Sequence, residues 1–254
     1  MVISVQNFFN EIDLLTIKCE ALRGAVDLFV VAESPITFSG LNKPMYFQEK
    51  KHLFDKYPIH YVDLSGIEET DFMKESPWNR EQVQKNAVLE EVKKINPEIV
   101  LWGDTDETPR PDVVERFRSM DVPTANLEMD MLLYYFNREH PDKWPYHRIA
   151  KWNGEIAPRG DFSLPMIPDA GWHFEYFGLR QMLLDKINAT SHAIEDTARS
   201  FYKAVRAGSK PGLEKCSPYP VEKLPDYVRA FKDFSKFKPF FLDQNFLTTA
   251  EERG

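Results

Sequence analysis

The sequence predicts an α/β fold in one domain, with a mainly parallel central sheet flanked by helices. Strand-like and helix-like segments alternate through the first two-thirds of the chain, as expected when helices connect parallel strands. Two strand-like runs, 26–32 and 99–103, are almost wholly apolar, which is typical of strands buried on both faces. A length of 254 residues suits one large domain, so we assign residues 1–254 to it.

The spacing of apolar residues predicts the elements of the first half. Apolar residues recur every three or four positions over 10–24 and over 79–95, which predicts two amphipathic helices that end at Gly24 and before Pro97. Arg80 falls within the apolar face of the second helix, so we expect it to point into a polar cleft. The predicted elements are, in chain order, helix 10–24, strand 26–32, helix 50–56, strand 59–64, helix 79–95 and strand 99–103.

The second half alternates less regularly and ends in a segment of different composition. Its predicted elements are helix 112–120, extended segments 126–137 and 148–152, and helices 179–188 and 194–207. Residues 210–254 begin with a stretch rich in Lys, Phe and Pro. Because these aromatic side chains need a surface to bury against, we expect 210–254 to wrap around the domain.

Composition limits the partners and the location of the protein. The 32 basic and 40 acidic residues give a net charge of −8, which argues against nucleic acid as a main partner. No apolar run is long enough to predict a membrane span, and residues 1–6 lack the features of a secretory signal. With only two cysteines, these features favour a cytoplasmic location.

The strongest local signal is a group of acids directly after the predicted strand 99–103. Asp104, Asp106 and Glu107 come at the carboxyl end of that strand, and in open α/β sheets ligands bind at this edge. Crowded carboxylates repel one another unless a cation or donors compensate them, and a hard divalent cation prefers oxygen ligands. The pattern indicates a metal site that can bridge a pyrophosphate; the alternative is a solvated acidic turn.

A second signal is His173, which lies between aromatic residues and can complete a metal site or donate to a phosphate. A lone histidine of this kind is also common as a structural residue. Glu175 and Asp169 lie close to it in the sequence and are candidates for a general base. Three tryptophans can either stack on sugar rings or belong to the core: Trp144, Trp152 and Trp172.

Several segments, taken in order, point to a family. They are Asn10–Leu15, Val26–Ser34, Thr37–Gly40, Lys43–Pro44, Trp78–Glu81 with Asn86, Asp104–Pro111 and Asp169–His173. The ordered set resembles glycosyltransferase family 17, over roughly residues 7–235. The best-known members of this family are the β-1,4-mannosyl-glycoprotein 4-β-N-acetylglucosaminyltransferases, which add the bisecting N-acetylglucosamine to N-glycans.

The resemblance implies a GT-A-like fold and inverting transfer from UDP-N-acetylglucosamine to a carbohydrate or glycan hydroxyl. It also implies a divalent metal, Mn²⁺ or Mg²⁺. By motif match, the metal ligands are Asp104, Asp106 and His173, and the donor-binding residues are Glu33, Arg80, Asn86, Asp104 and Trp172. His192 is a weaker second histidine candidate.

The chain departs from the family pattern at two points. Animal members carry an N-terminal membrane anchor, which this sequence does not show, so we expect a soluble microbial or viral type of member with no membrane span. Glu175 stands where the family commonly has a small hydroxyl residue. The general base stays open among Glu175, Asp169 and Asp161, because the choice depends on distances.

Two other functions remain open. A sugar nucleotidyltransferase would use a similar sheet edge and metal, but usually has a Gly-rich loop with a basic residue after the first strand, which this chain lacks. A non-catalytic carbohydrate-binding protein on the same scaffold would leave the repulsion among Asp104, Asp106 and Glu107 uncompensated. The phosphate-binding motifs of Rossmann dehydrogenases and P-loop kinases are absent.

Overall fold

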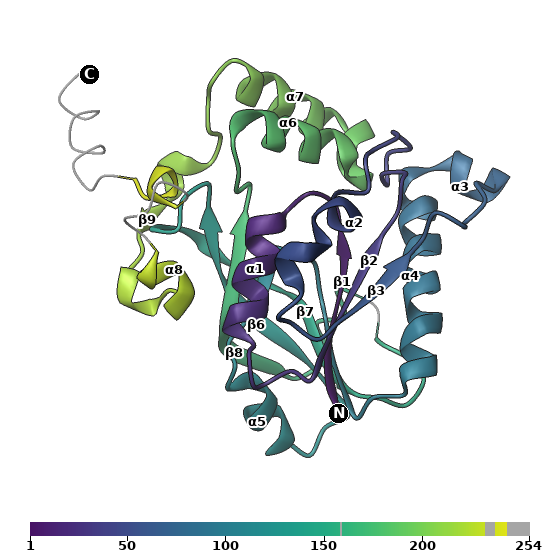
Figure 1. Cartoon of the computed structure of the whole chain (residues 1–254). Coiled ribbons are helices and arrows are strands. Elements are labelled where there is room, and N and C mark those ends of the chain that lie inside the picture. Colours follow the sequence, from purple (N-terminus) through teal and green to yellow (C-terminus); the bar gives the residue numbers. More distant parts are fainter. Residues whose placement is uncertain (158, 232–236, 243–254) are drawn as a thin grey trace.

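The computed structural model describes residues 1–157, 159–231 and 237–242, and within them one mixed sheet of nine strands is flanked by helices (Figure 1). The strand order is β3-β2-β1-β4-β7-β6-β8-β5, with β9 beside β7. The α/β class, the single central sheet and its flanking helices are therefore confirmed, and the arrangement agrees with a GT-A-like fold.

The first half of the sheet is parallel. Its strands are β1 (Val2–Phe8), β2 (Leu28–Glu33), β3 (Ile59–Asp63) and β4 (Ile99–Trp102). Helix α1 (Ile12–Ala21) covers one face and α4 (Pro77–Ile95) covers the other. Alternate residues of β2 serve the two faces, because Phe29 packs with the α1 side and Val30 with the α4 side. All four strands therefore end at the same edge of the sheet.

The second half of the sheet is mostly antiparallel, so the expected parallel arrangement holds only for the first half. Its main strands are β5 (Glu107–Pro109), β6 (Thr124–Leu133), β7 (Arg138–Lys151) and β8 (Met166–Glu175). Strand β7 joins the halves by pairing antiparallel with both β4 and β6, whereas β6 and β8 run parallel. The sequence indicated only parts of β6 and β7 and did not indicate β5 or β8.

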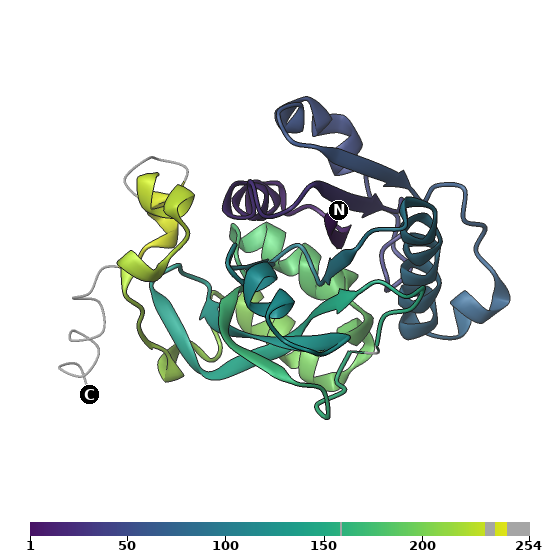
Figure 2. The same ribbon diagram turned by 90° about the horizontal axis from the view of Figure 1, so that it is seen from below.

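The remaining helices lie around this sheet. They are α2 (Tyr46–Lys50), α3 (Asp71–Glu75), α5 (Val113–Arg118), α6 (Arg180–Ala189) and α7 (Asp196–Arg206). Helices α6 and α7 lie side by side beyond the carboxyl ends of β1 and β2 (Figures 1 and 2). A hydrogen bond of 3.1 Å from the Ser39 N–H to the Ala189 carbonyl joins α6 to the loop after β2.

The described part of the C-terminal segment packs on the face of β8 that carries Trp172 and Phe174. It includes β9 (Ser217–Pro218) and α8 (Asp226–Ala230). Tyr219, Val228 and Phe237 share one apolar cluster with Trp172 and Phe174 of β8. Of the segment expected to wrap around the domain, 210–254, residues 232–236 and 243–254 lie outside the described residues. No helix in the described ranges combines the length and the apolar character needed to cross a bilayer.

Candidate active site

Strand β4 delivers an acidic turn to the carboxyl edge of the sheet. Asp104 lies partly exposed, whereas Asp106 and Glu107 are buried. One carboxylate oxygen from each of the three lies within 4.8 Å of the others. The hydroxyl of Thr105 donates to the Asn7 carbonyl at 3.0 Å and so ties the turn to the end of β1. The sequence prediction of three acids gathered at this edge is therefore confirmed.

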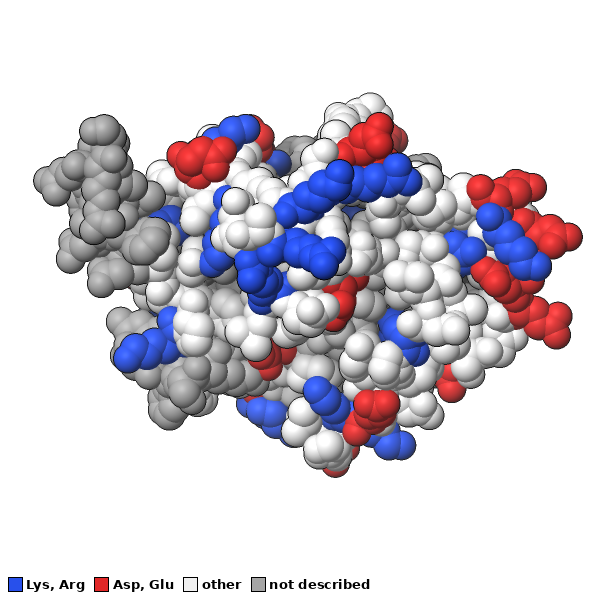
Figure 3. Space-filling model, turned by 90° about the horizontal axis from the view of Figure 1, so that it is seen from above, with Lys and Arg blue, Asp and Glu red and all other residues white. Residues whose placement is uncertain are grey.

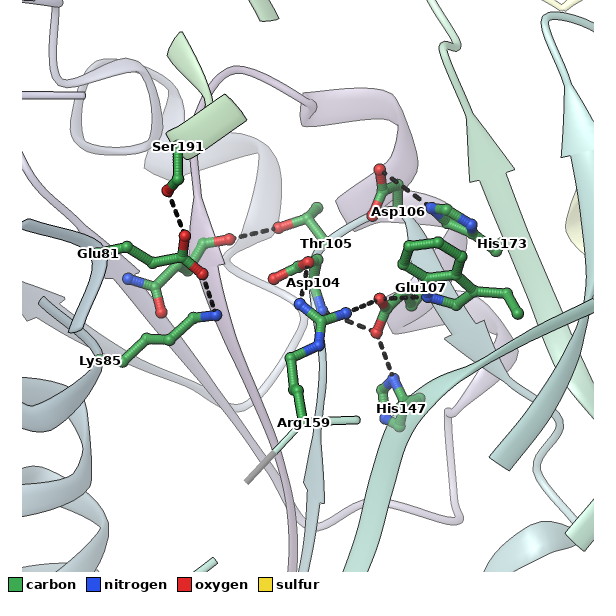
Figure 4. A network of polar contacts seen from close by, with 12 residues as sticks. Glu81, Lys85, Asp104, Thr105, Asp106, Glu107, His147, Arg159, His173 and Ser191 are labelled. Atoms are coloured by element: carbon green, nitrogen blue, oxygen red, sulfur yellow. Dashed lines mark hydrogen bonds and ion pairs between the residues drawn. The ribbon is translucent and has the colours of Figure 1, made fainter. Parts of the chain in front are cut away.

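Glu107 is surrounded by donors (Figure 4). Its Oε1 accepts hydrogen bonds from the Trp144 indole, at 2.7 Å, and from the Arg159 guanidinium. Its Oε2 accepts from the Asp104 backbone N–H at 3.0 Å and lies 3.1 Å from Nδ1 of His147. Burial alone would raise the pKa of Glu107, but the charge of Arg159 and the His147 contact hold it well below its usual range. A carboxylate offers about four acceptor sites, so Glu107 has none left for a metal.

Asp106 is only half satisfied. Its Oδ2 pairs with Lys186 of α6 and lies 3.7 Å from Nε2 of His173. Its Oδ1 is buried and has no hydrogen-bond partner among the described residues. Burial would raise the pKa of Asp106, but the Lys186 charge keeps the group ionised. A buried anionic oxygen without a partner fits a bound cation, so Asp106, with the partly exposed Asp104, is suited to hold a divalent metal.

Alternation along β8 separates a cleft face from a packing face. His173 and Glu175 point to the cleft face, where Nε2 of His173 lies 3.0 Å from Oε2 of Glu175. The His173 ring packs on Trp144, with ring centroids 4.2 Å apart. Burial raises the pKa of Glu175, although the charge of His173 opposes this shift. The carboxylate of Glu175 is thus held close to Asp106 and is a stronger base than an exposed glutamate.

Two clefts of different lining meet at the acidic turn. The first cleft, of about 130 Å³, lies at the ends of β1 and β2 and is lined by residues that include Asn7, Phe8 and Phe9. The second cleft, of about 650 Å³, lies between α4 and β7 and contains several aromatic rings. The residues that line both clefts are Phe38, Asp104, Asp106, Lys186 and Thr190.

Glu81 of α4 connects two segments that line the second cleft. Glu81 pairs with Lys85 one turn later and accepts a hydrogen bond from the hydroxyl of Ser191 (Figure 4). Ser191 belongs to the short 3₁₀ helix η2 (Ser191–Ile194), which follows α6. His192 also lines this cleft and lies edge-on to Trp78, with ring centroids 4.6 Å apart.

Of the residues predicted from the sequence, the structure brings together Asp104, Asp106, His173 and Glu175. Three predicted donor-binding residues lie outside both clefts. Glu33 is fully buried, accepts from the Phe47 N–H and holds Lys43 at 3.1 Å. Arg80 pairs with Glu69 and donates to the Phe38 carbonyl at 2.9 Å, so it fixes the loop that carries Phe38. Asn86 is exposed on α4.

Three further predicted residues also lie away from the clefts. Trp172 is buried on the packing face of β8, where its indole donates to the Tyr219 hydroxyl at 3.2 Å. Asp169 is exposed and pairs with Arg110 at 2.9 Å. Asp161 is partly exposed, and its side chain accepts from the backbone N–H of the nearby Ser163. None of the three lines either cleft.

Sequence reasoning missed the cations that surround the acidic turn. Lys18 of α1 is fully buried and donates to the Asp104 carbonyl at 2.6 Å, and burial lowers its pKa to about 8. Its position within the apolar face of helix 10–24 was a usable signal. Arg159, which also pairs with Asp104 at 2.5 Å, and Lys186 come from distant segments and carry no comparable local signal.

Comparisons with known proteins identify the family of the chain. A family model described as glycosyltransferase family 17 matches residues 1–208. No curated protein matches the sequence. The S. aureus TarS 1–349 structure is similar at 10% identity with a TM-score of 0.41, and the alignment covers 99% of this chain and 77% of that chain.

Two other solved structures are similar at the same low level. The complex of S. aureus TarS 1–349 with UDP-GlcNAc matches at 8% identity, with a TM-score of 0.43 and coverage of 82% of this chain and 73% of that one. The inositol-1-phosphate CTP transferase from T. maritima matches at 8% identity, with a TM-score of 0.38 and coverage of 82% and 96%. The family match spans most of the sequence and includes every residue of the acidic turn. The chain therefore belongs to glycosyltransferase family 17 and is a glycosyltransferase.

Proposed function

We propose that this glycosyltransferase moves N-acetylglucosamine from UDP-N-acetylglucosamine to a carbohydrate hydroxyl, with inversion at the anomeric carbon and with Mn²⁺ or Mg²⁺ bound. The observation that carries the proposal is the meeting of two unlike clefts at Asp104 and Asp106. A transferase of this kind needs a donor site and an acceptor site that share the position of the bond being broken.

The first cleft is assigned to the nucleoside of the donor. The rings of Phe8 and Phe9 in its lining offer apolar faces that suit a planar base. With the nucleoside in this cleft, its diphosphate reaches the junction at Asp104 and Asp106. The choice of N-acetylglucosamine as the donor sugar rests on the family resemblance.

Asp104 and Asp106 are assigned as the residues that would hold the divalent cation, through the partly exposed carboxylate and the unpartnered Oδ1 respectively. A cation bound there would neutralise charge on the departing diphosphate. Glu107 fixes the shape of the turn through its contacts with Trp144, His147 and Arg159. Preorganised charges of this type are usually the largest single contribution to catalysis.

Glu175 is assigned as the general base. It lines the second cleft beside Asp106, and its raised pKa suits removal of a proton from an acceptor hydroxyl. Asp169 and Asp161, the other two candidates, line neither cleft. We assign His173 to orient Glu175, because its Nε2 lies closer to Glu175, at 3.0 Å, than to Asp106, at 3.7 Å.

The second cleft is assigned to the acceptor. Trp78, Trp144 and Tyr146 line it and offer flat apolar faces of the kind that stack on sugar rings. Its volume of about 650 Å³ suits an acceptor of more than one sugar unit. The hydroxyl that attacks would approach from this side, while UDP leaves through the first cleft.

The proposal is tested by measuring UDP release from UDP-N-acetylglucosamine with Mn²⁺ and with a chelator, against UDP-glucose and UDP-galactose. We expect slow, metal-dependent release that is selective for the N-acetylglucosamine donor, because water can replace the acceptor. Equal release from all three donors would overturn the donor assignment. An absence of both release and UDP binding would overturn the proposed function.

A further inference from the structure

Lys186 lies at the junction of the two clefts, where the proposed reaction places the diphosphate. It comes from the last turn of α6 and lines both clefts. Its ammonium group pairs with Oδ2 of Asp106 and lies 3.5 Å from Oε1 of Glu11. Only 17% of its side chain is exposed. Burial alone would lower the pKa of Lys186, but the charges of Asp106 and Glu11 raise it well above its usual range, so the group stays cationic.

This ion pair competes with the use of Asp106 as a metal ligand. A divalent cation at Oδ1 of Asp106 would lie within a few ångströms of the ammonium group that holds Oδ2 of the same carboxylate. Like charges at that separation repel strongly where solvent is partly excluded. When both cations share the Asp106 carboxylate, each is therefore stabilised less than it would be alone, unless a new anion enters the junction.

The diphosphate of the donor is such an anion. We propose that Lys186 changes partner when the donor binds: it neutralises Asp106 in the free enzyme and pairs with the donor diphosphate in the complex, which leaves Asp106 to the metal. The inference rests on the proposed function, because it needs a nucleotide diphosphate at the junction. It makes Lys186 a catalytic residue that stabilises the leaving group.

Glu11 supports this exchange because it keeps Lys186 at the junction in both states. Its Oε2 accepts from the backbone N–H groups of Phe9 and Asn10, at 3.2 and 3.1 Å, so its position is fixed by the chain after β1. Lysine has a long stem with rotatable donors, and a small swing of its end can change partner. The required movement therefore involves one side chain.

The surroundings of Lys186 also favour an anionic ligand. A band of Lys and Arg crosses the face formed by α6 and α7, although the chain as a whole carries a charge of −8 (Figure 3). Exposed basic residues of this hairpin include Arg180, Arg199, Lys203 and Arg206. Acidic residues gather at the far side, around α3 (Figure 3). None of these four residues lines either cleft, so their field acts on the approach of a phosphorylated ligand and not on its contacts at the junction.

The test uses Lys186→Met, which keeps an unbranched side chain of nearly the same length and removes its charge. Without nucleotide, Mn²⁺ should bind the variant several-fold more tightly, because the competing cation is gone. At saturating Mn²⁺, UDP should bind at least about tenfold more weakly, which corresponds to the loss of one charge-assisted hydrogen bond. Titration calorimetry measures both affinities, and uridine, which lacks phosphates, should bind the variant and the wild type equally.

Two matched variants separate this role from a structural one. Lys186→Arg keeps the charge and should retain most of the UDP affinity. Lys203→Met removes an exposed lysine of α7 that lines neither cleft and should change neither affinity. If Lys186 had only a structural role, Lys186→Met would weaken the binding of both Mn²⁺ and UDP, or of neither.

The outcomes distinguish this inference from the proposed function. If wild-type protein binds UDP and Lys186→Met binds Mn²⁺ and UDP with unchanged affinities, the exchange is wrong and the proposed function stands. A variant that binds both ligands more weakly would likewise overturn the exchange. If wild-type protein binds no UDP in the presence of Mn²⁺, both the proposed function and the inference fail.

Discussion

The two sides of the acidic turn differ in how fully their charges are satisfied. On the side of β7, Glu107 is completely buried, and Trp144, His147 and Arg159 all contact its carboxylate. On the side of α6, Asp106 faces both clefts and keeps one buried oxygen without a partner among the described residues. The two acids are adjacent in the chain and are buried to a similar degree.

The difference separates a structural carboxylate from a ligand-binding one. A buried charge that already has all its hydrogen bonds fixes its neighbours and gains nothing from a ligand. A buried charge with an empty acceptor position is stabilised further when a cation arrives. Changes on the Glu107 side should therefore act on stability, and changes on the Asp106 side should act on ligand binding and catalysis.

The largest effect is expected for Glu107→Gln. The substitution removes the anion that His147 and Arg159 share in a buried cluster and leaves Arg159 with Asp104 alone, and breaking a buried ion pair in this way costs about 3–5 kcal/mol. Urea denaturation should show this decrease in the free energy of unfolding. Asp106→Asn should cost less than half as much, because Lys186 lines the second cleft and keeps Glu11 as a partner. If the two variants lost equal free energy of unfolding, the distinction between the Glu107 side and the Asp106 side of the turn would be wrong.

Glu175→Gln tests whether Glu175, which lines the second cleft, is the general base. Loss of a general base should lower kcat about 10²–10⁴-fold, while the free energy of unfolding should change by only about 1 kcal/mol. The wild-type rate should fall as pH decreases through the raised pKa of Glu175, because the protonated acid cannot accept a proton. That acidic limb should disappear in the variant. A variant with wild-type kcat and an unchanged pH profile would show that another group is the base.

Lys18→Met tests the buried cation beneath the turn. The pKa of Lys18 is lowered to about 8 in the folded protein, below its unfolded value of 10.5. The unfolded chain therefore binds more protons between these values, and the wild type should gain stability as pH rises through about 8. Relative to Lys18→Met, the gain between pH 7 and pH 9.5 should be about 2 kcal/mol. If the free energies of unfolding of the two proteins changed with pH in the same way, the lowered pKa of Lys18 would be contradicted.

Asp169→Asn should have the smallest effect. The exposed Asp169 pairs with Arg110 and lines neither cleft, and ion pairs at the surface contribute about 1 kcal/mol or less. Asparagine also tolerates the positive φ of 47° at this position. Thermal melting and UDP-release rates should both match the wild type. A large loss of activity would return Asp169 to the list of candidate bases.

The sequence was informative where one local pattern determined the structure. The apolar run 99–103 predicted β4, and because parallel strands end at a shared edge, the acids after it could be placed at the site. Strand β8 was missed because Pro168, Gly171 and the left-handed backbone at Asp169 interrupt the alternation that marks a strand. His173 and Glu175 could be named from the sequence, but their orientation toward the cleft could not.

The remainder of the site depends on contacts between distant segments. Glu107 looked equivalent to Asp106 in the sequence, and only the packing of β7 and residue 159 against it shows that its oxygens are occupied. Arg80 was placed correctly on the buried face of its helix, yet its ion-pair partner, Glu69, lies in the loop before α3. Periodicity indicates which side chains are buried, and it does not indicate which charges they meet.

The most direct test of the account is UDP binding by titration calorimetry, with Mn²⁺ and with a chelator, for the wild type, Asp106→Asn and a folded Glu107→Gln. We expect Mn²⁺ to strengthen UDP binding by the wild type and by Glu107→Gln, and to have no effect on Asp106→Asn. The account would be contradicted if Asp106→Asn kept the full response to Mn²⁺, or if only Glu107→Gln lost it.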